Sequence, residues 1–180
     1  MKILVPIIAL LIMVSSCAAP ETDIANIFSY KFYLIKPPTG TLSFEDEDLQ
    51  FTFTPESDNI KILFVNKSAR HAIINWEKAI YVDKDGASHR LITKKVDYKD
   101  KDKTQIPTSI APGSQTIEWV TPADHIYRTL FVWNVRPMFP KLTNAEIIDS
   151  WDRATFNVIL PIEVNGEPRD YRFEFKVKTR

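Results

Sequence analysis

Regular alternation of apolar and polar residues near the C-terminus limits the fold of this chain more than any other feature. In residues 155–164 the apolar positions are Phe156, Val158, Leu160, Ile162 and Val164. Asn165-Gly166 follows, a pair typical of tight hairpin turns, and residues 171–177 alternate in the same way. Side chains of a strand point alternately to opposite faces, so the pattern predicts a hairpin with one apolar face. Such a face needs a second sheet to cover it.

Further segments have strand character. Alternation in residues 49–53, the continuous apolar run 60–65, and residues 73–82, 87–92 and 126–135 each predict a strand, the second of them buried on both sides. Residues 144–151 predict a short helix, with Thr143 and Glu146 forming a capping box. Pro161 predicts an edge position or a bulge in its strand. We therefore expect an all-β fold, a single antiparallel β-sandwich of about eight strands with at most one short helix near 144–151.

Composition excludes several classes of protein. The chain has 23 basic and 23 acidic residues, which gives no electrostatic reason to expect nucleic acid as a partner. Its 4 glycines are few for loops that cradle nucleotides, whereas its 12 prolines suit a loop-rich β protein. No cofactor is predicted.

The N-terminus has the order of a secretory signal. Lys2 precedes an apolar run over residues 3–14, which is short for a membrane-spanning helix, and small residues then lead to Cys17, the only cysteine. This arrangement resembles the lipobox of bacterial lipoproteins. The resemblance implies that residues 1–16 are removed as a signal peptide and that Cys17 carries acyl chains such as palmitate. An ordinary signal peptide cut near the cysteine is the alternative.

The same resemblance gives the protein an expected place and organisation. Residues 17–26 become the lipidated cysteine with a short tether, and residues 27–180 form the β-sandwich domain. Ala18 follows the cysteine instead of aspartate, which in Gram-negative bacteria implies the outer membrane, facing the periplasm or the cell surface. A Gram-positive host would place the protein on the cell membrane.

The middle of the chain carries a second, looser resemblance. The loops between its predicted strands are similar to those of immunoglobulin-like accessory modules in bacterial surface lipoproteins. These loops are Asn66-Lys67-Ser68, the turn at 83–86 and the Pro-Gly segment at 110–114. The similarity covers residues 60–120. It implies a fold and assigns no catalytic residue.

Candidate metal ligands are few. His71, His89 and His125 lie at no spacing that predicts a metal site, and we expect scattered surface histidines. Residues 83–86 match only part of a calcium-binding loop. The acidic run 45–48 predicts a solvated loop, with calcium binding at an end of the sandwich as the alternative. No metal site is therefore assigned.

Residues 119–139 are rich in aromatic side chains interleaved with arginines. A core strand with its loop is the favoured interpretation of this stretch, and a contact surface is the alternative. Pro137 and Pro140 enclose an apolar pair, so Arg136, Met138 and Phe139 are the candidate partner-binding residues if this segment is exposed.

No catalytic motif is recognisable in the chain. G-x-S-x-G and Ser-x-x-Lys are both absent, and we assign no catalytic residue. We expect a membrane-anchored envelope lipoprotein acting as a non-catalytic binding or assembly module for an envelope protein or a cell-wall glycan. The alternatives are a small envelope hydrolase that uses loop carboxylates and a purely structural subunit of an envelope complex.

Overall fold

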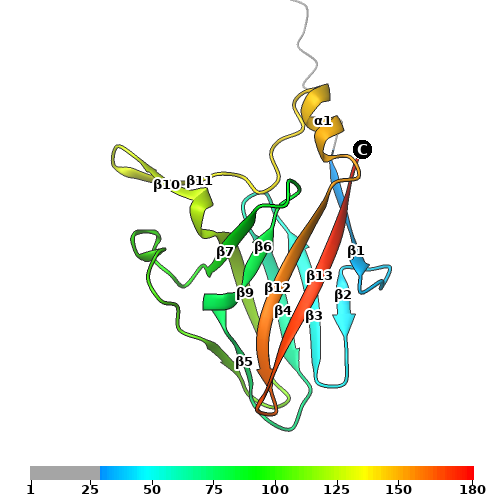
Figure 1. Ribbon diagram of the computed structural model, residues 1–180, viewed down its shortest axis with the longest axis vertical. Coiled ribbons are helices and arrows are strands. Elements are labelled where there is room, and N and C mark those ends of the chain that lie inside the picture. The colour runs from blue at the N-terminus through cyan, green and yellow to red at the C-terminus, as the bar shows by residue number, and fades with distance from the viewer. Residues whose placement is uncertain (1–28) are drawn as a thin grey trace, which may run out of the picture.

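The computed structural model describes residues 29–180, so Cys17, the signal peptide and the tether lie outside the described residues. The described part has one α-helix and many antiparallel strands, which confirms the all-β prediction (Figure 1). It contains thirteen strands, more than the eight expected, because several are only three or four residues long. The immunoglobulin-like detail stays a prediction. The strands are β1 (Tyr30–Lys36), β2 (Ser43–Glu45), β3 (Leu49–Pro55), β4 (Ile60–Asn66), β5 (Ala72–Ile74), β6 (Ile80–Val82), β7 (Ser88–Thr93), β8 (Thr108–Ile110), β9 (Gln115–Pro122), β10 (Ile126–Thr129), β11 (Val132–Val135), β12 (Thr155–Val164) and β13 (Glu167–Thr179), and the helix is α1 (Ala145–Trp151).

One continuous path of hydrogen-bonded strands folds over to make both layers. Its order is β1-β13-β12-β6-β7-β9-β4-β3-β2, with β5 attached to β12 and β8 attached to β5. Strand β7 forms the corner, because Ser88–Arg90 pair with β6 and Leu91–Thr93 pair with β9. A separate two-stranded sheet, β10-β11, projects from this body (Figure 1).

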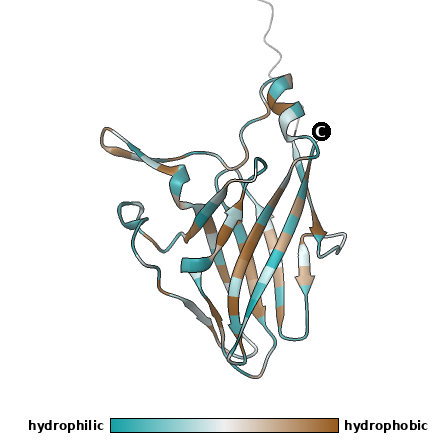
Figure 2. Ribbon diagram, in the orientation of Figure 1, coloured by the Kyte–Doolittle hydropathy of each residue, from teal (hydrophilic) through white to brown (hydrophobic). Residues whose placement is uncertain are grey.

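The C-terminal hairpin supplies one wall of the core, as its sequence predicts. Strands β12 and β13 pair from Thr155↔Lys176 to Val164↔Glu167, and the turn residues Asn165 and Gly166 both have positive φ. The alternating apolar residues of β12 are all buried. Across the core, the Phe53 ring of β3 lies 4.7 Å from that of Phe173 on β13. Figure 2 shows apolar residues repeating along these strands.

Pro161 does not lie at an edge. Strand β12 has β13 on one side and both β6 and β5 on the other, so it is central. On the second side, pairing stops after Ile159 and resumes at Ile162. The Pro161 carbonyl accepts a hydrogen bond from the Asn75 amide of the connecting segment at 3.0 Å. Proline has no N–H to donate to a neighbouring strand. Pro161 lies at the interruption between β6 and β5, where strand pairing does not need that donor.

The strand predicted over residues 73–82 is interrupted. A 3₁₀ turn over Trp76–Lys78 separates β5 from β6, and the Asn75 side chain caps it by accepting a hydrogen bond from the Glu77 amide at 3.1 Å. The turn places Trp76 in the core, where its side chain is 1% exposed. Strand β4 also differs from expectation, because buried residues alternate with half-buried ones instead of both faces being covered.

The helix predicted near 144–151 is confirmed, but its cap differs. Asn144 is the N-cap, and its side-chain oxygen accepts a hydrogen bond from the Ile147 amide at 2.9 Å. Thr143 lies one residue before the cap, so the predicted capping box does not form there. Asparagine is a stronger N-cap residue than threonine, which agrees with its place at the cap.

Candidate functional site

The segment predicted to contact a partner points inward. Arg136 is exposed, but Met138 and Phe139 are only 2% and 3% exposed, so they do not form a surface patch. The Phe139 ring lies 4.7 Å from that of Phe32, and its amide donates to the Ser57 carbonyl at 3.0 Å. These contacts close one end of the sandwich. Apolar side chains in a stiff loop have in this case become part of the core.

The exposed apolar surface lies instead on the hairpin of β10 and β11. Leu130, Phe131 and Val132 at its tip are 90%, 87% and 61% exposed, and Tyr127 is 45% exposed. The interpretation of residues 119–139 as a core strand with its loop therefore holds for Val120, Met138 and Phe139 but not for this hairpin. In Figure 2 the apolar tip stands away from the body of the molecule. Large apolar side chains gathered at one exposed tip are typical of a binding surface.

The base of the hairpin is firmly held. Ile126 is 1% exposed and belongs to a small core cluster with Ile92 and Ala123. The Arg136 amide donates a hydrogen bond to the His125 carbonyl at 2.8 Å, which closes the hairpin below its last strand pair. The tip is thus presented on an ordered base.

Charge on the hairpin has one sign. Residues 126–136 contain two arginines and no acidic residue. The Arg128 guanidinium lies 5.9 Å from the centre of the Trp133 ring, within reach of a cation–π contact. The surface offered to a partner is therefore apolar at its tip and basic along its sides.

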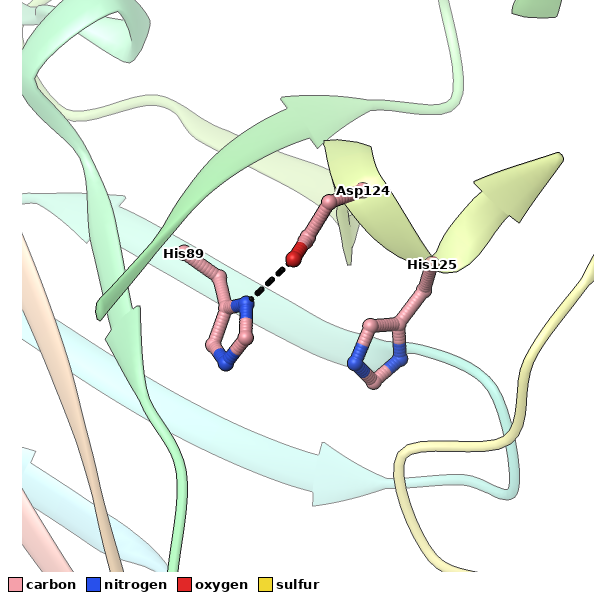
Figure 3. Close-up of side chains that lie close together, drawn as sticks. All are labelled: His89, Asp124 and His125. Carbon is pink, nitrogen blue, oxygen red and sulfur yellow. Dashed lines mark hydrogen bonds and ion pairs between the residues drawn. The ribbon is translucent and has the colours of Figure 1, made fainter. Parts of the chain in front are cut away.

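Two histidines and two aspartates gather beside the base of the hairpin. His89 belongs to β7, and Asp124 and His125 lie in the 3₁₀ turn directly before β10. His89 Nδ1 lies 2.7 Å from Asp124 Oδ2, and His89 Nε2 lies 3.1 Å from Asp83 Oδ2. The rings of His89 and His125 are 5.4 Å apart (Figure 3). The expectation of scattered histidines is thus wrong for this pair.

The surroundings of the two histidines shift their pKa values in opposite directions. Burial by itself lowers the pKa of His89, but its hydrogen bonds with Asp124 and Asp83 outweigh burial and raise the pKa above its ordinary value. Burial lowers the pKa of His125. Burial acts to raise the pKa of Asp83, yet the hydrogen bonds that it accepts from His89 and two backbone amides hold the pKa below its usual range. The carboxylates of Asp83 and Asp124 therefore stabilise positive charge at this place in the fold.

The third histidine lies apart from this cluster. His71 is exposed, and its Nδ1 lies 3.1 Å from the Ser109 hydroxyl. His71 lies directly before β5, and β5 does not pair with β7. For His71, the expected surface position is confirmed.

Two carboxylates of the acidic run 45–48, Asp46 and Asp48, are held by protein partners, whereas Glu45 and Glu47 are exposed, as expected of a solvated loop. Asp46 Oδ1 accepts hydrogen bonds from the amides of Asp48 and Leu49 at 2.9 and 2.7 Å. Asp48 pairs with Arg169 of β13 at 2.7 Å, and the Tyr171 hydroxyl donates to Asp46 at 2.8 Å. These bonds join the β2–β3 turn to the C-terminal hairpin, so the run has a structural role.

Comparisons with known proteins give no relative from which a site could be transferred. No family model, no curated protein and no solved structure matches this chain. Among residues 29–180, no helix has the length and apolar character needed to cross a membrane.

Proposed function

We propose that this protein is a lipid-anchored envelope lipoprotein that binds another envelope protein without catalysis, through the tip of the β10–β11 hairpin. The observation that carries the proposal is the exposure of Leu130, Phe131 and Val132 on a hairpin whose base is ordered. The anchor is the acylated Cys17 expected from the lipobox. Arg136, the exposed member of the predicted contact set, lies at the same hairpin base.

The chemistry of the tip fits a protein pocket better than a glycan. Branched aliphatic side chains and a phenyl ring gain most from being transferred out of water into an apolar cavity. A sugar instead needs hydrogen-bonding groups, which the side chains of residues 130–132 do not offer. The flanking Arg128 and Arg136 match a pocket with acidic residues at its rim. We therefore propose a protein partner that has an apolar pocket with an acidic rim.

A photo-crosslinking residue at position 131 tests this contact in intact cells. We expect p-benzoylphenylalanine in place of Phe131 to form one crosslinked protein adduct, because the side chain would lie inside the partner's pocket. Excess wild-type protein should compete for the adduct. Phe131→Asp or Arg128→Glu protein should compete at least tenfold less well, since each variant removes an anchor of the type that dominates binding energy.

Ile106 provides a matched control for this experiment. It is 88% exposed, close to the value for Phe131, but it lies in the loop before β8. The same crosslinker at position 106 should give no adduct of that mass. Equal crosslinking from both positions, crosslinking only to lipid, or competition unaffected by Phe131→Asp would each refute the proposed contact.

The histidine–aspartate cluster favours a second candidate, the small envelope hydrolase. His89, His125 and two carboxylates converge as hydrolytic sites require. Both nitrogens of His89 are bonded to carboxylates, which leaves neither free to act as a general base. We therefore rank this candidate second. Turnover of ester or phosphate substrates that is lost in His125→Gln would reverse that order.

A further inference from the structure

We infer that His89, Asp124 and His125 form a binding site for a divalent transition-metal ion, for which Zn²⁺ is the best match. One potential ligand atom from each residue lies within 4.8 Å of the other two. Two imidazoles with one carboxylate form a ligand set typical of zinc, whereas Ca²⁺ and Mg²⁺ prefer sets made of oxygen.

The ligand atoms, which lie within 4.8 Å of one another, have to move to accept the ion. Ligand atoms around tetrahedral zinc stand about 3.3 Å from one another, given metal–ligand bonds of about 2.0–2.2 Å. His89 Nδ1 and Asp124 Oδ2 are now 2.7 Å apart, with a hydrogen bond between them. Zinc replaces the proton on Nδ1, which is released to water, and moves the two atoms slightly apart. The Asp124 side chain is 60% exposed, so it is free to make that movement.

Each histidine has its second nitrogen fixed by another group. His89 Nε2 donates to Asp83 Oδ2 at 3.1 Å when His89 is neutral. Asp83 is itself held, because its other oxygen accepts from the amides of Asp85 and Ala87 at 2.9 and 2.8 Å. A carboxylate behind a ligating histidine selects the tautomer and orients the ring, as in many zinc sites. Nδ1 of His89 is thereby directed at the ion.

His125 shows the same arrangement with a backbone partner. Its Nδ1 lies 3.1 Å from the Arg136 carbonyl, to which it donates when neutral. That hydrogen bond leaves Nε2 as the ligand atom, and Figure 3 shows one ring nitrogen of His125 turned toward His89. Three protein ligands leave a further position for water on the exposed side.

An ion bound at this site connects two separate parts of the fold. His89 lies on β7 at the corner of the sandwich, and Asp124 and His125 lie directly before β10. A shared ion therefore joins the body of the molecule to the root of the hairpin. The inference does not depend on the proposed partner contact, because zinc binding and crosslinking at position 131 are measured separately.

Zinc titration of the full-length protein tests the site. The protein is purified in detergent, stripped of metal with a chelator and titrated against a chromophoric competitor. We expect one equivalent of zinc to bind. His89→Gln and His125→Gln should each weaken affinity by more than about 100-fold, and Asp83→Asn by about 10- to 100-fold, as for removal of a group behind a ligand. Co²⁺ should give the visible absorption of a four- or five-coordinate ion with nitrogen ligands.

His71→Gln is the matched control, because it removes the one histidine outside the cluster and should leave zinc affinity unchanged. Circular dichroism of each metal-free variant establishes that it folds, and Asp124→Asn adds a substitution of equal size at an exposed position. Absence of stoichiometric binding by the wild type, or equal binding by the variants of His89, His125 and Asp124, would overturn the assignment.

Discussion

Phe173→Ala is expected to lower the free energy of unfolding by about 3–5 kcal/mol, the largest stability effect of the predicted substitutions. Phe173 is 1% exposed and lies where the two layers of the sandwich meet. Its ring centre is 4.7 Å from that of Phe53 and 5.0 Å from that of Phe51, both on the facing strand β3. Removing the ring leaves a cavity between rigid strands that cannot collapse to fill it.

Urea denaturation of the wild type and the variant measures this loss. Phe131→Ala is the control, because it removes the same ring from a position that is 87% exposed and should change stability by no more than about 0.5 kcal/mol. Phe173→Leu keeps part of the volume and should fall between the two. Similar losses for Phe131→Ala and Phe173→Ala would show that burial is assigned wrongly at one of these positions.

The parts of the fold that could be predicted are those that one strand and its turn specify locally. The alternation in residues 155–164 identifies the buried face without any knowledge of what covers it. Asn165-Gly166 accepts positive φ at little cost and so fixes the register of the hairpin. The acidic run 45–48 shows the opposite case. Its partners Arg169 and Tyr171 lie more than a hundred residues further along the chain, where no local pattern connects them.

The β10–β11 hairpin escaped prediction because its turn has no signal. Leu130 occupies a left-handed conformation with φ of 50°, where glycine or asparagine is usual. Without such a residue, 126–135 has the pattern of one uninterrupted strand. Hydrophobicity alone assigns the hairpin residues to the core and Met138 and Phe139 to a contact surface. The structure shows the reverse, with an exposed hairpin tip and a buried Met138–Phe139 pair.

The histidine–aspartate cluster depends on tertiary structure. His89 meets Asp124 and His125 because β7 changes from one layer to the other and pairs with β9, which ends just before them. The spacing of these residues in the sequence does not indicate that β7 changes from one layer to the other. The adjacent Asp124-His125 pair and the nearby Asp83 were the available signals, and neither is specific without the strand order.

Cys17→Ser is expected to release the protein completely from the membrane fraction. The lipobox resemblance assigns all acyl chains to this cysteine, and two or more chains are what make anchoring stable. Ser29 lies 12 positions after Cys17, which allows about 40 Å of extended chain between lipid and domain. Fractionation and metabolic labelling with a radioactive fatty acid measure the effect. Glu21→Gln, a substitution within the tether, is the control and should remain labelled and membrane-bound.

Combining Cys17→Ser with Phe131→Asp separates the anchor from the hairpin. If the hairpin binds a protein, Cys17→Ser alone already releases the domain from lipid vesicles, and the second substitution adds nothing there. If Cys17→Ser still binds anionic vesicles and the double variant does not, the apolar tip with Arg128 and Arg136 inserts into the bilayer surface, and the protein-partner proposal is wrong. Full membrane association of both variants, or an unmodified Cys17 thiol in the native protein, would contradict the anchor itself, because no other group in the proposal holds this domain at a membrane.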